Sequence, residues 1–525
     1  MESMSSSRRA AVIAAALLAL IVTACTASGT ATTGGGSGTG SAAQSGSASI
    51  IPDLSRMHWH ACGSLAGLQC TSVQVPVNYD QPNGRKLSLA LSMAPATAPK
   101  SQQQGILLVN PGGPGASGLS LASEVQQGLN STVASQYDVV GFDTRGVGSS
   151  QPQLTCDPSF FSGVRPDYIF STAAQEQVLI SRAKTYASDC EKRYGWLLPY
   201  MTTANMARDL DSIRQAFGVT QLNYFAFSYG TYLGEVYGTM FPSRVRRMVL
   251  DSTVDPTGVW WTDNLQQDYA FQGRMNAFFT WVAKYNSIYH LGSTTQQVHN
   301  AWYQARNQLK KTPITSNGRA LIGPAEYDDT FLLGGYLNTL WPGLAQALAD
   351  YLQHGSTTEM ITQFNQNGVQ NENEFAVYNA VQCADVNWPR SWSTWDSVNA
   401  RVYKTAPFEA WDNAWYNAAC AFWPVTGPAK PVQINGSGLP GILMLQGTLD
   451  AATPYQGAED ARKALPSARM VVVSGGGNHG QSLEFPPDSC VQTYLNNYLL
   501  NGALPGGSGA VSATCPVVPD PVPNQ

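Results

Sequence analysis

The sequence predicts an α/β protein with a mostly parallel sheet of about eight strands and a large helical cap inserted into it. Short, nearly continuous apolar runs recur along the chain, among them 105–110 (GILLVN), 137–143 (YDVVGFD) and 441–447 (GILMLQG). Parallel strands that are covered by helices on both faces have this composition. Helical patterns separate the runs, and the clearest spans 204–217, where one apolar stripe ends before Gly218. Strands and helices that alternate in this way predict an α/β sheet.

The other strands are expected where the same signals return. The segments TSVQVPVNY and KLSLALSMAPA predict an antiparallel pair, which the turn DQPNGR joins. Further apolar runs at 222–227, 246–252 and 468–475 continue the sheet. The predicted core therefore has two parts, 51–255 and 436–525.

The insertion between these parts, residues 256–435, contains eleven of the thirteen tryptophans. It also has long amphipathic stretches, such as 265–288 and 331–353, which predict helices. Insertions after the carboxyl ends of strands lie over the place where such sheets bind ligands, so we expect this one to act as a lid. Alternatively, the tryptophans form the core of an independent helical domain, and we expect this of most of them.

The first fifty residues have the layout of an export signal followed by a tether. Residues 1–25 contain Arg8 and Arg9, an apolar stretch, and VTAC ending at Cys25, which predicts a lipoprotein-type signal peptide with Cys25 lipidated. A plain secretory signal is the alternative, and the two arginines are a hint of twin-arginine export. Residues 26–50 are rich in Gly, Ser, Thr and Ala and predict a flexible linker. We therefore expect a secreted protein, or one tethered to a membrane only through this lipid.

Composition narrows the possible partners. The chain has 525 residues, a net charge of −5 and only 12% charged residues, so nucleic acid is not expected as a partner. Without Cys25, eight cysteines remain, and an exported chain favours disulfides over metal thiolates. No CxxC pair occurs, and no metal site is expected. Sequence alone does not choose the pairing; we expect neighbours to pair, namely Cys62 with Cys70, Cys156 with Cys190, Cys383 with Cys420, and Cys490 with Cys515.

A serine lies where one predicted strand meets a glycine-spaced helix. In NYFAFSYGTYLG, Ser228 follows the apolar run 222–227, and the helix after it has glycines at 230, 234 and 238 on one face. Such a tight strand-to-helix corner is typical of a nucleophile elbow. A serine in a turn is the simpler interpretation, and position 226 is Ala where the pattern usually has Gly. The decision depends on whether partners for a nucleophile occur elsewhere.

Two such partners follow in the chain order that this fold class uses, which is Ser, then acid, then His. His479 lies in the glycine-rich segment SGGGNHGQS directly after the last predicted strand, and it is the best candidate for the base. Asp450 follows the strand before it, in LMLQGTLDAATP, and is the preferred acid. Asp251 and Asp255, which follow an earlier strand, remain rival acids.

Acyl transfer also requires donors for the oxyanion of the tetrahedral intermediate. One expected donor is the backbone N–H of Tyr229, at the start of the helix after the serine. The second is expected in the loop VNPGGPGASG, where glycines leave backbone N–H groups unobstructed. Gly113 is the preferred residue there, and Gly112 is the alternative.

Several stretches together resemble one peptidase family. They are NPGGPGASG, VVGFDTRGVGSS, TTANMARDLDSIRQAFGV, FSYGTYLGEVYGTMFPSRVRRMVLD, GTLDAATPYQGAEDARKAL and GNHG. The chain is similar here to the α/β-hydrolase peptidases of the proline iminopeptidase family and, more closely, to the secreted tripeptidyl aminopeptidases of actinobacteria. The resemblance covers roughly 60–255 and 436–515, and the insertion only in size and position.

The resemblance implies an α/β-hydrolase fold and a serine exopeptidase that releases short peptides, in particular tripeptides, from peptide N-termini. It implies Ser228, Asp450 and His479 as the catalytic triad, with Gly113 and Tyr229 as oxyanion donors. Ala226 departs from the family pattern. So does the proline at 111, where iminopeptidases usually have His, and this favours the tripeptidyl branch.

An exopeptidase must also recognise an α-ammonium group, which calls for a carboxylate under the lid. Residues 325–331, Glu374 and Asp385 are candidates, although acidic residues on helices are mostly solvated. No metal or organic cofactor is needed. Two rival functions remain, a carboxylesterase with the same triad and a surface lipoprotein that binds a ligand without catalysis.

Overall fold

The computed structural model describes residues 49–483, 486–507 and 509–523. The predicted signal peptide, Cys25 and nearly all of the predicted linker lie outside these residues. Within the described ranges, none of the helices combines the length and the apolar character that crossing a membrane would require.

A single large sheet forms the centre of the core, and it has ten strands in the order β1-β2-β3-β5-β4-β6-β7-β10-β11-β12. From β5 to β12 all neighbours are parallel, whereas β1, β2 and β3 pair antiparallel at one edge. The strands, in sheet order, are His60–Ala61, Gln69–Pro76, Lys86–Ala94, Tyr137–Phe142, Gly105–Asn110, Leu222–Ser228, Val245–Thr253, Ile442–Gly447, Ala468–Ser474 and Ala513–Pro516. The mostly parallel α/β sheet is thus confirmed. The count exceeds the expected eight because two short strands, β1 and β12, extend its edges.

Helices cover both faces of the central strands, which explains why those strands are apolar nearly throughout. On β4, Leu107 and Val109 pack with one set of helices, while Ile106 and Leu108 pack with the other. The first set is α2 (Leu121–Gly128), α3 (Ser131–Gln136) and α17 (Ser489–Asn501). The second is α5 (Thr203–Ala216), α6 (Tyr229–Met240) and α16 (Tyr455–Ala464). Burial on both sides removes the alternation that a half-exposed strand would have.

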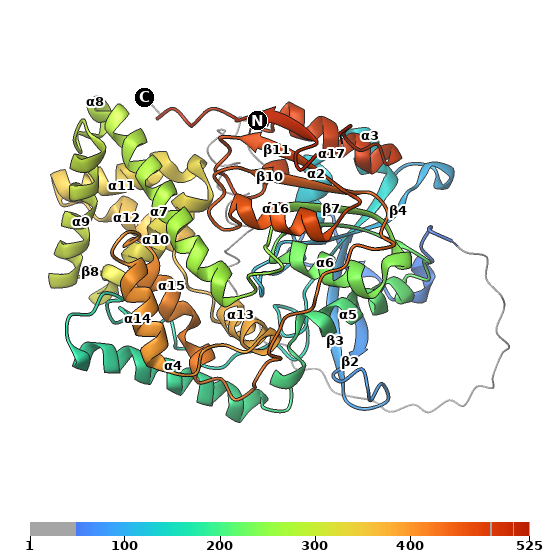
Figure 1. The fold of residues 1–525 in the computed structure, drawn as a ribbon, viewed down its shortest axis with the longest axis horizontal. Coiled ribbons are helices and arrows are strands. Elements are labelled where there is room, and N and C mark those ends of the chain that lie inside the picture. Colours follow the sequence, from blue (N-terminus) through green and yellow to red (C-terminus); the bar gives the residue numbers. More distant parts are fainter. Residues whose placement is uncertain (1–48, 484–485, 508, 524–525) are drawn as a thin grey trace.

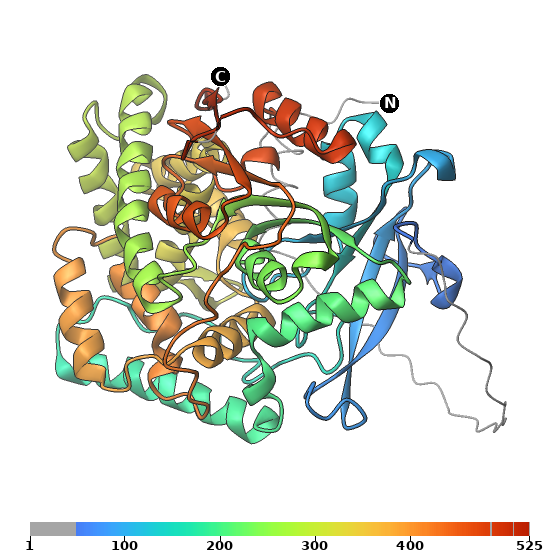
Figure 2. The same ribbon diagram turned by 45° about the vertical axis from the view of Figure 1, so that its right-hand side comes forward.

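The cap lies to one side of the sheet, and its elements follow β7 and precede β10 in the chain (Figures 1 and 2). Its helices are α7 (Trp261–Lys284), α8 (Asn286–Tyr289), α9 (Thr295–Lys311), α10 (Pro324–Tyr336), α11 (Trp341–His354), α12 (Thr358–Asn367), α13 (Glu372–Asp385), α14 (Trp392–Val402) and α15 (Ala410–Asn417). A small hairpin, β8 (Ile314–Ser316) and β9 (Arg319–Ile322), follows α9. Trp281, Trp302 and Trp341 lie in the apolar core of this layer, as expected for most tryptophans of the insertion.

One helix from outside the predicted insertion packs with the cap. Helix α4 (Ala173–Tyr194) precedes β6 in the chain, and it runs beneath α14 and α15 in Figure 1. Its Leu179 and Ala183 share a buried cluster with Trp411 and Trp415. Sequence periodicity could not place this helix, because an amphipathic pattern does not tell which layer its apolar face meets.

Four disulfides connect the pairs of neighbouring cysteines that the sequence predicts. Cys383–Cys420 joins α13 to the short helix η6 (Ala418–Ala421) inside the cap, across 37 residues. Cys62–Cys70 closes a loop of only 8 residues beside β1. The other two, Cys156–Cys190 and Cys490–Cys515, tie a loop to α4 and α17 to β12.

Loop length predicts how much each bridge stabilises the fold. Because a longer closed loop removes more entropy from the unfolded chain, the double variant Cys383→Ala/Cys420→Ala should lower the free energy of unfolding by about 4 kcal/mol. The variant Cys62→Ala/Cys70→Ala, as the matched control, should lower it by about 2.5 kcal/mol. Urea unfolding followed by tryptophan fluorescence measures both. Equal losses, or a larger loss for the shorter loop, would contradict the prediction.

Candidate active site

Ser228 occupies a strained corner between β6 and α6. Its φ is +55° and its ψ is −132°, a backbone conformation that residues other than glycine rarely adopt and that costs about 1–3 kcal/mol. The helix starts immediately afterwards, so the serine is presented at the end of the strand. The predicted strand-to-helix corner is therefore present in the structure.

The glycine face of α6 explains how the corner is accommodated. A Cβ added to Gly230 would lie 2.6 Å from Oδ1 of Asn110 and 3.0 Å from Cβ of Ala226, and one added to Gly234 would lie 2.8 Å from the ring of Tyr224. The helix thus packs directly on β4 and β6. Ala226 is tolerated in place of the usual glycine because the residue opposite its methyl group, Gly230, has no side chain.

The structure brings Asp450 and His479 together from the ends of β10 and β11. Nδ1 of His479 lies 3.0 Å from each carboxylate oxygen of Asp450. The same carboxylate accepts hydrogen bonds from the N–H groups of Ala452 and Thr453, at 3.0 and 3.2 Å, and from the Thr453 hydroxyl at 3.1 Å. These bonds fix the acid in place to orient the imidazole. Asp450 is thereby favoured over its rivals.

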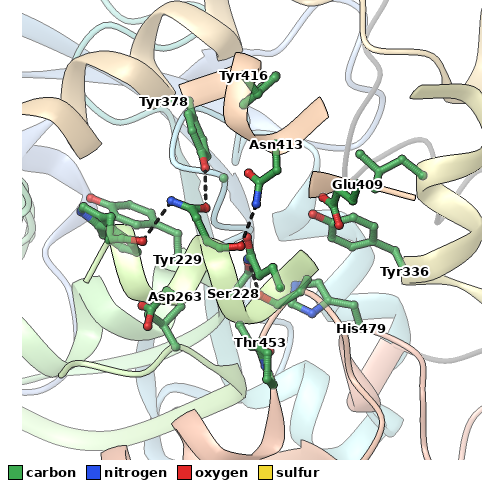
Figure 3. A pocket seen from close by; sticks show the side chains of 18 of the residues that line it. Ser228, Tyr229, Asp263, Tyr336, Tyr378, Glu409, Asn413, Tyr416, Thr453 and His479 are labelled. Atoms are coloured by element: carbon green, nitrogen blue, oxygen red, sulfur yellow. Dashed lines mark hydrogen bonds between the residues drawn. The ribbon is translucent and has the colours of Figure 1, made fainter. Parts of the chain in front are cut away.

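The other nitrogen of the imidazole is available for the serine. Nε2 of His479 is buried and makes no hydrogen bond within the described part of the chain. Ser228 and His479 line the same cavity, and in Figure 3 the ring extends from its backbone toward the serine. The backbone N–H of His479 donates to the carbonyl of Tyr336 in the cap, at 2.8 Å. The ring of Tyr336 lies edge-on to the imidazole, with 5.4 Å between the two ring centres. The cap therefore helps to hold the base.

Neither rival acid contacts the imidazole. Asp251 is fully buried and accepts from the N–H groups of Gln481 (2.9 Å) and Ser482 (2.8 Å), and also from the Ser482 hydroxyl. Burial raises its pKa to about 6, although these hydrogen bonds lower it in part. Asp255 instead accepts from the backbone and hydroxyl of Thr257, both at 2.7 Å. Asp251 thus anchors the loop that carries His479 and does not orient its ring.

The loop after β4 places its glycines against the serine. The N–H of Gly112 donates to Oδ1 of Asn110 at 3.0 Å, so it is already engaged, and Gly113 is the better oxyanion donor of the two. Gly112 is needed for another reason. Its φ is +101°, and an added Cβ would lie 2.9 Å from Cβ of Ser228 and 3.0 Å from the nitrogen of Tyr229. Gly113 and Tyr229 both line the cavity, as a shared oxyanion site requires.

The cavity lies between the carboxyl edge of the sheet and the cap. Its empty volume is about 1490 Å³ with the open mouth included. Tyr336, Tyr378 and Tyr416 contribute aromatic walls from the cap (Figure 3). Six acidic residues line it, and none of its described lining residues is lysine or arginine. The acids are Asp255, Asp263, Asp329, Glu374, Glu409 and Asp412.

The structure places the three sequence candidates for an ammonium-binding carboxylate in different surroundings. Asp329, from 325–331, lines the cavity but is paired with Arg165. Glu374 lines it as well, and burial raises its pKa to about 8. Asp385 is not among the lining residues; it accepts from the N–H and hydroxyl of Thr203 at 2.7 and 2.6 Å. Of the three candidates, only Glu374 combines a place in the cavity with freedom from an arginine.

Sequence reasoning missed three acids of the cavity wall, namely Asp263, Glu409 and Asp412. Oε2 of Glu409 and both carboxylate oxygens of Asp263 are buried and lack a hydrogen-bond partner among the described residues. Burial raises both pKa values well above the ordinary range, and the nearby charges of Asp268 and Asp412 raise that of Glu409 further. No motif marks them, because isolated acids in helical segments are usually solvated.

A strained serine that shares a cavity with an aspartate-bound histidine is the arrangement expected of a serine hydrolase. The alpha/beta hydrolase fold family matches residues 105–485, and the chain therefore belongs to this family of hydrolases.

Named relatives align over most of the chain. A tripeptidyl aminopeptidase of Streptomyces coelicolor is 39% identical over 472 residues, covering 87% of this chain and 85% of that protein. The serine protease Hip1 of Mycobacterium tuberculosis is 30% identical over 475 residues, covering 86% and 89%. Carboxylesterase B of the same organism is 30% identical over 473 residues, covering 85% and 88%. The similarity extends through the cap and thus beyond the core motifs.

The assignment of the acid predicts different effects for two buried aspartates. Asp450→Asn should lower kcat by about 10⁴-fold, because the amide no longer favours the imidazole tautomer that accepts the serine proton. Asp251→Asn should lower it much less, since Asp251 bonds to the loop and not to the ring. Steady-state kinetics on one ester substrate compares them. A larger loss in Asp251→Asn, in a variant with wild-type thermal stability, would reverse the assignment.

Proposed function

We propose that this protein is a serine exopeptidase that releases short peptides, in particular tripeptides, from peptides with a free N-terminus. The observation that carries the proposal is a capped cavity that opens on Ser228, is lined by six acids and has no lining lysine or arginine among the described residues. Such a cavity attracts the positively charged end of a peptide. The names of two relatives, tripeptidyl aminopeptidase and serine protease, support the same class of substrate.

In the proposed reaction, Oγ of Ser228 attacks the scissile carbonyl while Nε2 of His479 takes its proton. Asp450 stabilises the imidazolium that forms. The N–H groups of Gly113 and Tyr229 bind the oxyanion. The imidazolium then gives its proton to the leaving amine, which departs as the shortened peptide. Water, activated by the same histidine, hydrolyses the acyl-enzyme and frees the short peptide.

Glu409 is the side chain that we propose as the anchor of the substrate amino terminus. It lies across the cavity from Asp263 and next to Tyr336 (Figure 3), and one of its oxygens is buried without a partner among the described residues. Burial and the neighbouring acids disfavour its charged form. A bound ammonium group would offset that cost, because an opposite charge nearby favours ionisation.

The proposed location is outside the cell, either secreted or tethered through a lipid on Cys25. Four disulfides fit an oxidising compartment. The acidic cavity and the net charge of −5 fit peptides better than nucleic acid. The proposed chemistry uses only side chains and backbone of this chain and needs no cofactor.

A carboxylesterase is the second candidate, because a relative with that name aligns as fully as the protease does. The two functions differ in what the cavity must recognise. Six acids would not attract an ester with an uncharged acyl group, whereas they would attract a peptide with a positively charged amino terminus. A ligand-binding protein without catalysis is the third candidate, and it leaves the strain at Ser228 without a purpose.

Covalent labelling tests whether the site is catalytic. A fluorophosphonate should label the wild-type protein and should fail to label Ser228→Ala, because only an activated serine oxygen attacks this reagent. A wild-type protein that is folded and remains unlabelled would exclude both hydrolase functions. If labelling occurs but a short acyl ester is cleaved far better than a free-amino tripeptide anilide, the carboxylesterase is the correct function.

The anchor predicts a strong dependence on the free amino group. Wild-type protein should cleave a tripeptide anilide with a free N-terminus much faster than its N-acetyl form. Glu409→Gln should remove about 2 kcal/mol or more of this preference, roughly thirtyfold in kcat/KM, because a buried charge pair is lost. Glu374→Gln is the matched control, since Glu374 also lines the cavity but accepts a hydrogen bond from Asn371. An unchanged preference in Glu409→Gln would show that the anchor lies elsewhere.

A further inference from the structure

Three carboxylates converge on the wall of the cavity opposite Glu409. Asp263, at the start of α7, and Asp255 line the cavity, whereas Glu235 of α6 is not a lining residue but is close enough for both charges to act on it. Glu235 has no exposed surface, and neither of its carboxylate oxygens has a hydrogen-bond partner among the described residues. Burial raises its pKa well above the ordinary range, and the charges of Asp255 and Asp263 raise it further. The three side chains therefore interact electrostatically with one another.

Within the described ranges, no ion pair joins a cation to the cluster of Glu235, Asp255 and Asp263. Lys463 is exposed and paired with Asp460, and it acts on Asp255 only from beyond ion-pair distance. Two oxygens of the cluster, Oδ1 of Asp263 and Oδ2 of Asp255, lie beside the same glycine, Gly258. Buried carboxylates normally have a paired cation or a full set of donors. The arrangement therefore points to a positive charge that arrives with a ligand.

A metal ion does not meet this requirement. Of the residues that the structure describes, no group of three or more His, Cys, Asp or Glu side chains is arranged to hold one. The walls beside the cluster are aromatic, since Tyr229 and Trp260 line the cavity with it and pack together at 5.7 Å. Aromatic faces favour organic cations such as ammonium and guanidinium groups. An organic cation is thus the ligand that fits.

A substrate amino terminus cannot serve both walls of the cavity. In Figure 3, Asp263 and Glu409 lie on opposite sides of Ser228. A peptide has one N-terminus, and the function proposed above assigns it to Glu409. The second wall therefore calls for a second positive charge on the same substrate.

We propose that the cluster of Glu235, Asp255 and Asp263 is a specificity site for a lysine or arginine side chain of the peptide, at the residue whose carbonyl Ser228 attacks. That residue is expected nearest to the cluster, because its carbonyl oxygen must reach the N–H of Tyr229, and Asp263 lies on the same side of the cavity as Tyr229 in Figure 3. Asp263 and Asp255 contact the cation, and Glu235 adds further negative charge. The inference rests on the proposed function and gives it a preference for basic residues before the cleaved bond.

The test compares two tripeptide anilides with free N-termini that differ only in the third residue, lysine or norleucine. Norleucine keeps the four-carbon chain and lacks the ammonium group. Wild-type protein should prefer lysine by about tenfold or more in kcat/KM, as expected for a desolvated charge pair. Asp263→Asn should remove most of this preference by lowering kcat/KM for the lysine substrate. Its kcat/KM for the norleucine substrate should stay within about twofold of the wild-type value.

Two controls separate specificity from damage to the fold. Asp460→Asn changes a partly exposed acid of α16 and should leave both substrates unaffected. Labelling of Asp263→Asn by the fluorophosphonate at the wild-type rate shows an intact nucleophile. If Asp263→Asn does not fold, the ratio of the wild-type kcat/KM values for the lysine and norleucine substrates tests the inference alone.

Equal cleavage of both substrates by the wild-type protein would overturn the inference and leave the exopeptidase standing. An equal loss on both substrates in Asp263→Asn would also overturn it, because a purely structural role predicts that result. Cleavage of neither anilide by labelled wild-type protein would overturn the proposed function, and this inference with it.

Discussion

The candidate site depends on how closely α6 lies against β4 and β6. Gly230 and Gly234 leave no room for a Cβ on that face of the helix, and the contact forces Ser228 into its positive φ. The strain is sustained because both faces of the strand are packed in apolar cores. The same contact brings Gly112 against Ser228 and Tyr229. One tight packing interaction thus brings together the proposed nucleophile and the proposed oxyanion donors, from segments more than a hundred residues apart.

The base depends on the cap as much as on the core. The loop that carries His479 is bonded to the sheet through Asp251 and Ser252, whose side chains accept from N–H groups at residues 480–482. On the other side, the cap holds it through the carbonyl of Tyr336 and the N–H of Asn338. A movement of the cap would therefore move the imidazole. The cap that covers the cavity thus also helps to align the imidazole.

The cavity gathers acids at a cost to stability. Asp263, Glu235 and Glu409 are buried with carboxylate oxygens that lack partners among the described residues, and burial raises the pKa of each. Asp328, another buried acid of the cap, is by contrast paired with Arg306. The unpaired acids of the cavity are the ones to which the proposals above assign a cationic ligand. A site that is unfavourable when empty becomes favourable when a cation enters, which gives selectivity for charged substrates.

The sequence by itself determined the α/β class, the strand-to-helix corner at Ser228, and the order of Asp450 and His479. Each of these leaves a local signal, such as an apolar run or a glycine spacing. Only the tertiary structure separated Asp450 from Asp251, because both lie near the carboxyl ends of buried strands and only Asp450 bonds to the imidazole. It alone also revealed α4 beneath the cap and the two acidic walls at Glu409 and Asp263. Their significance comes from burial and missing partners, which depend on residues distant in the chain.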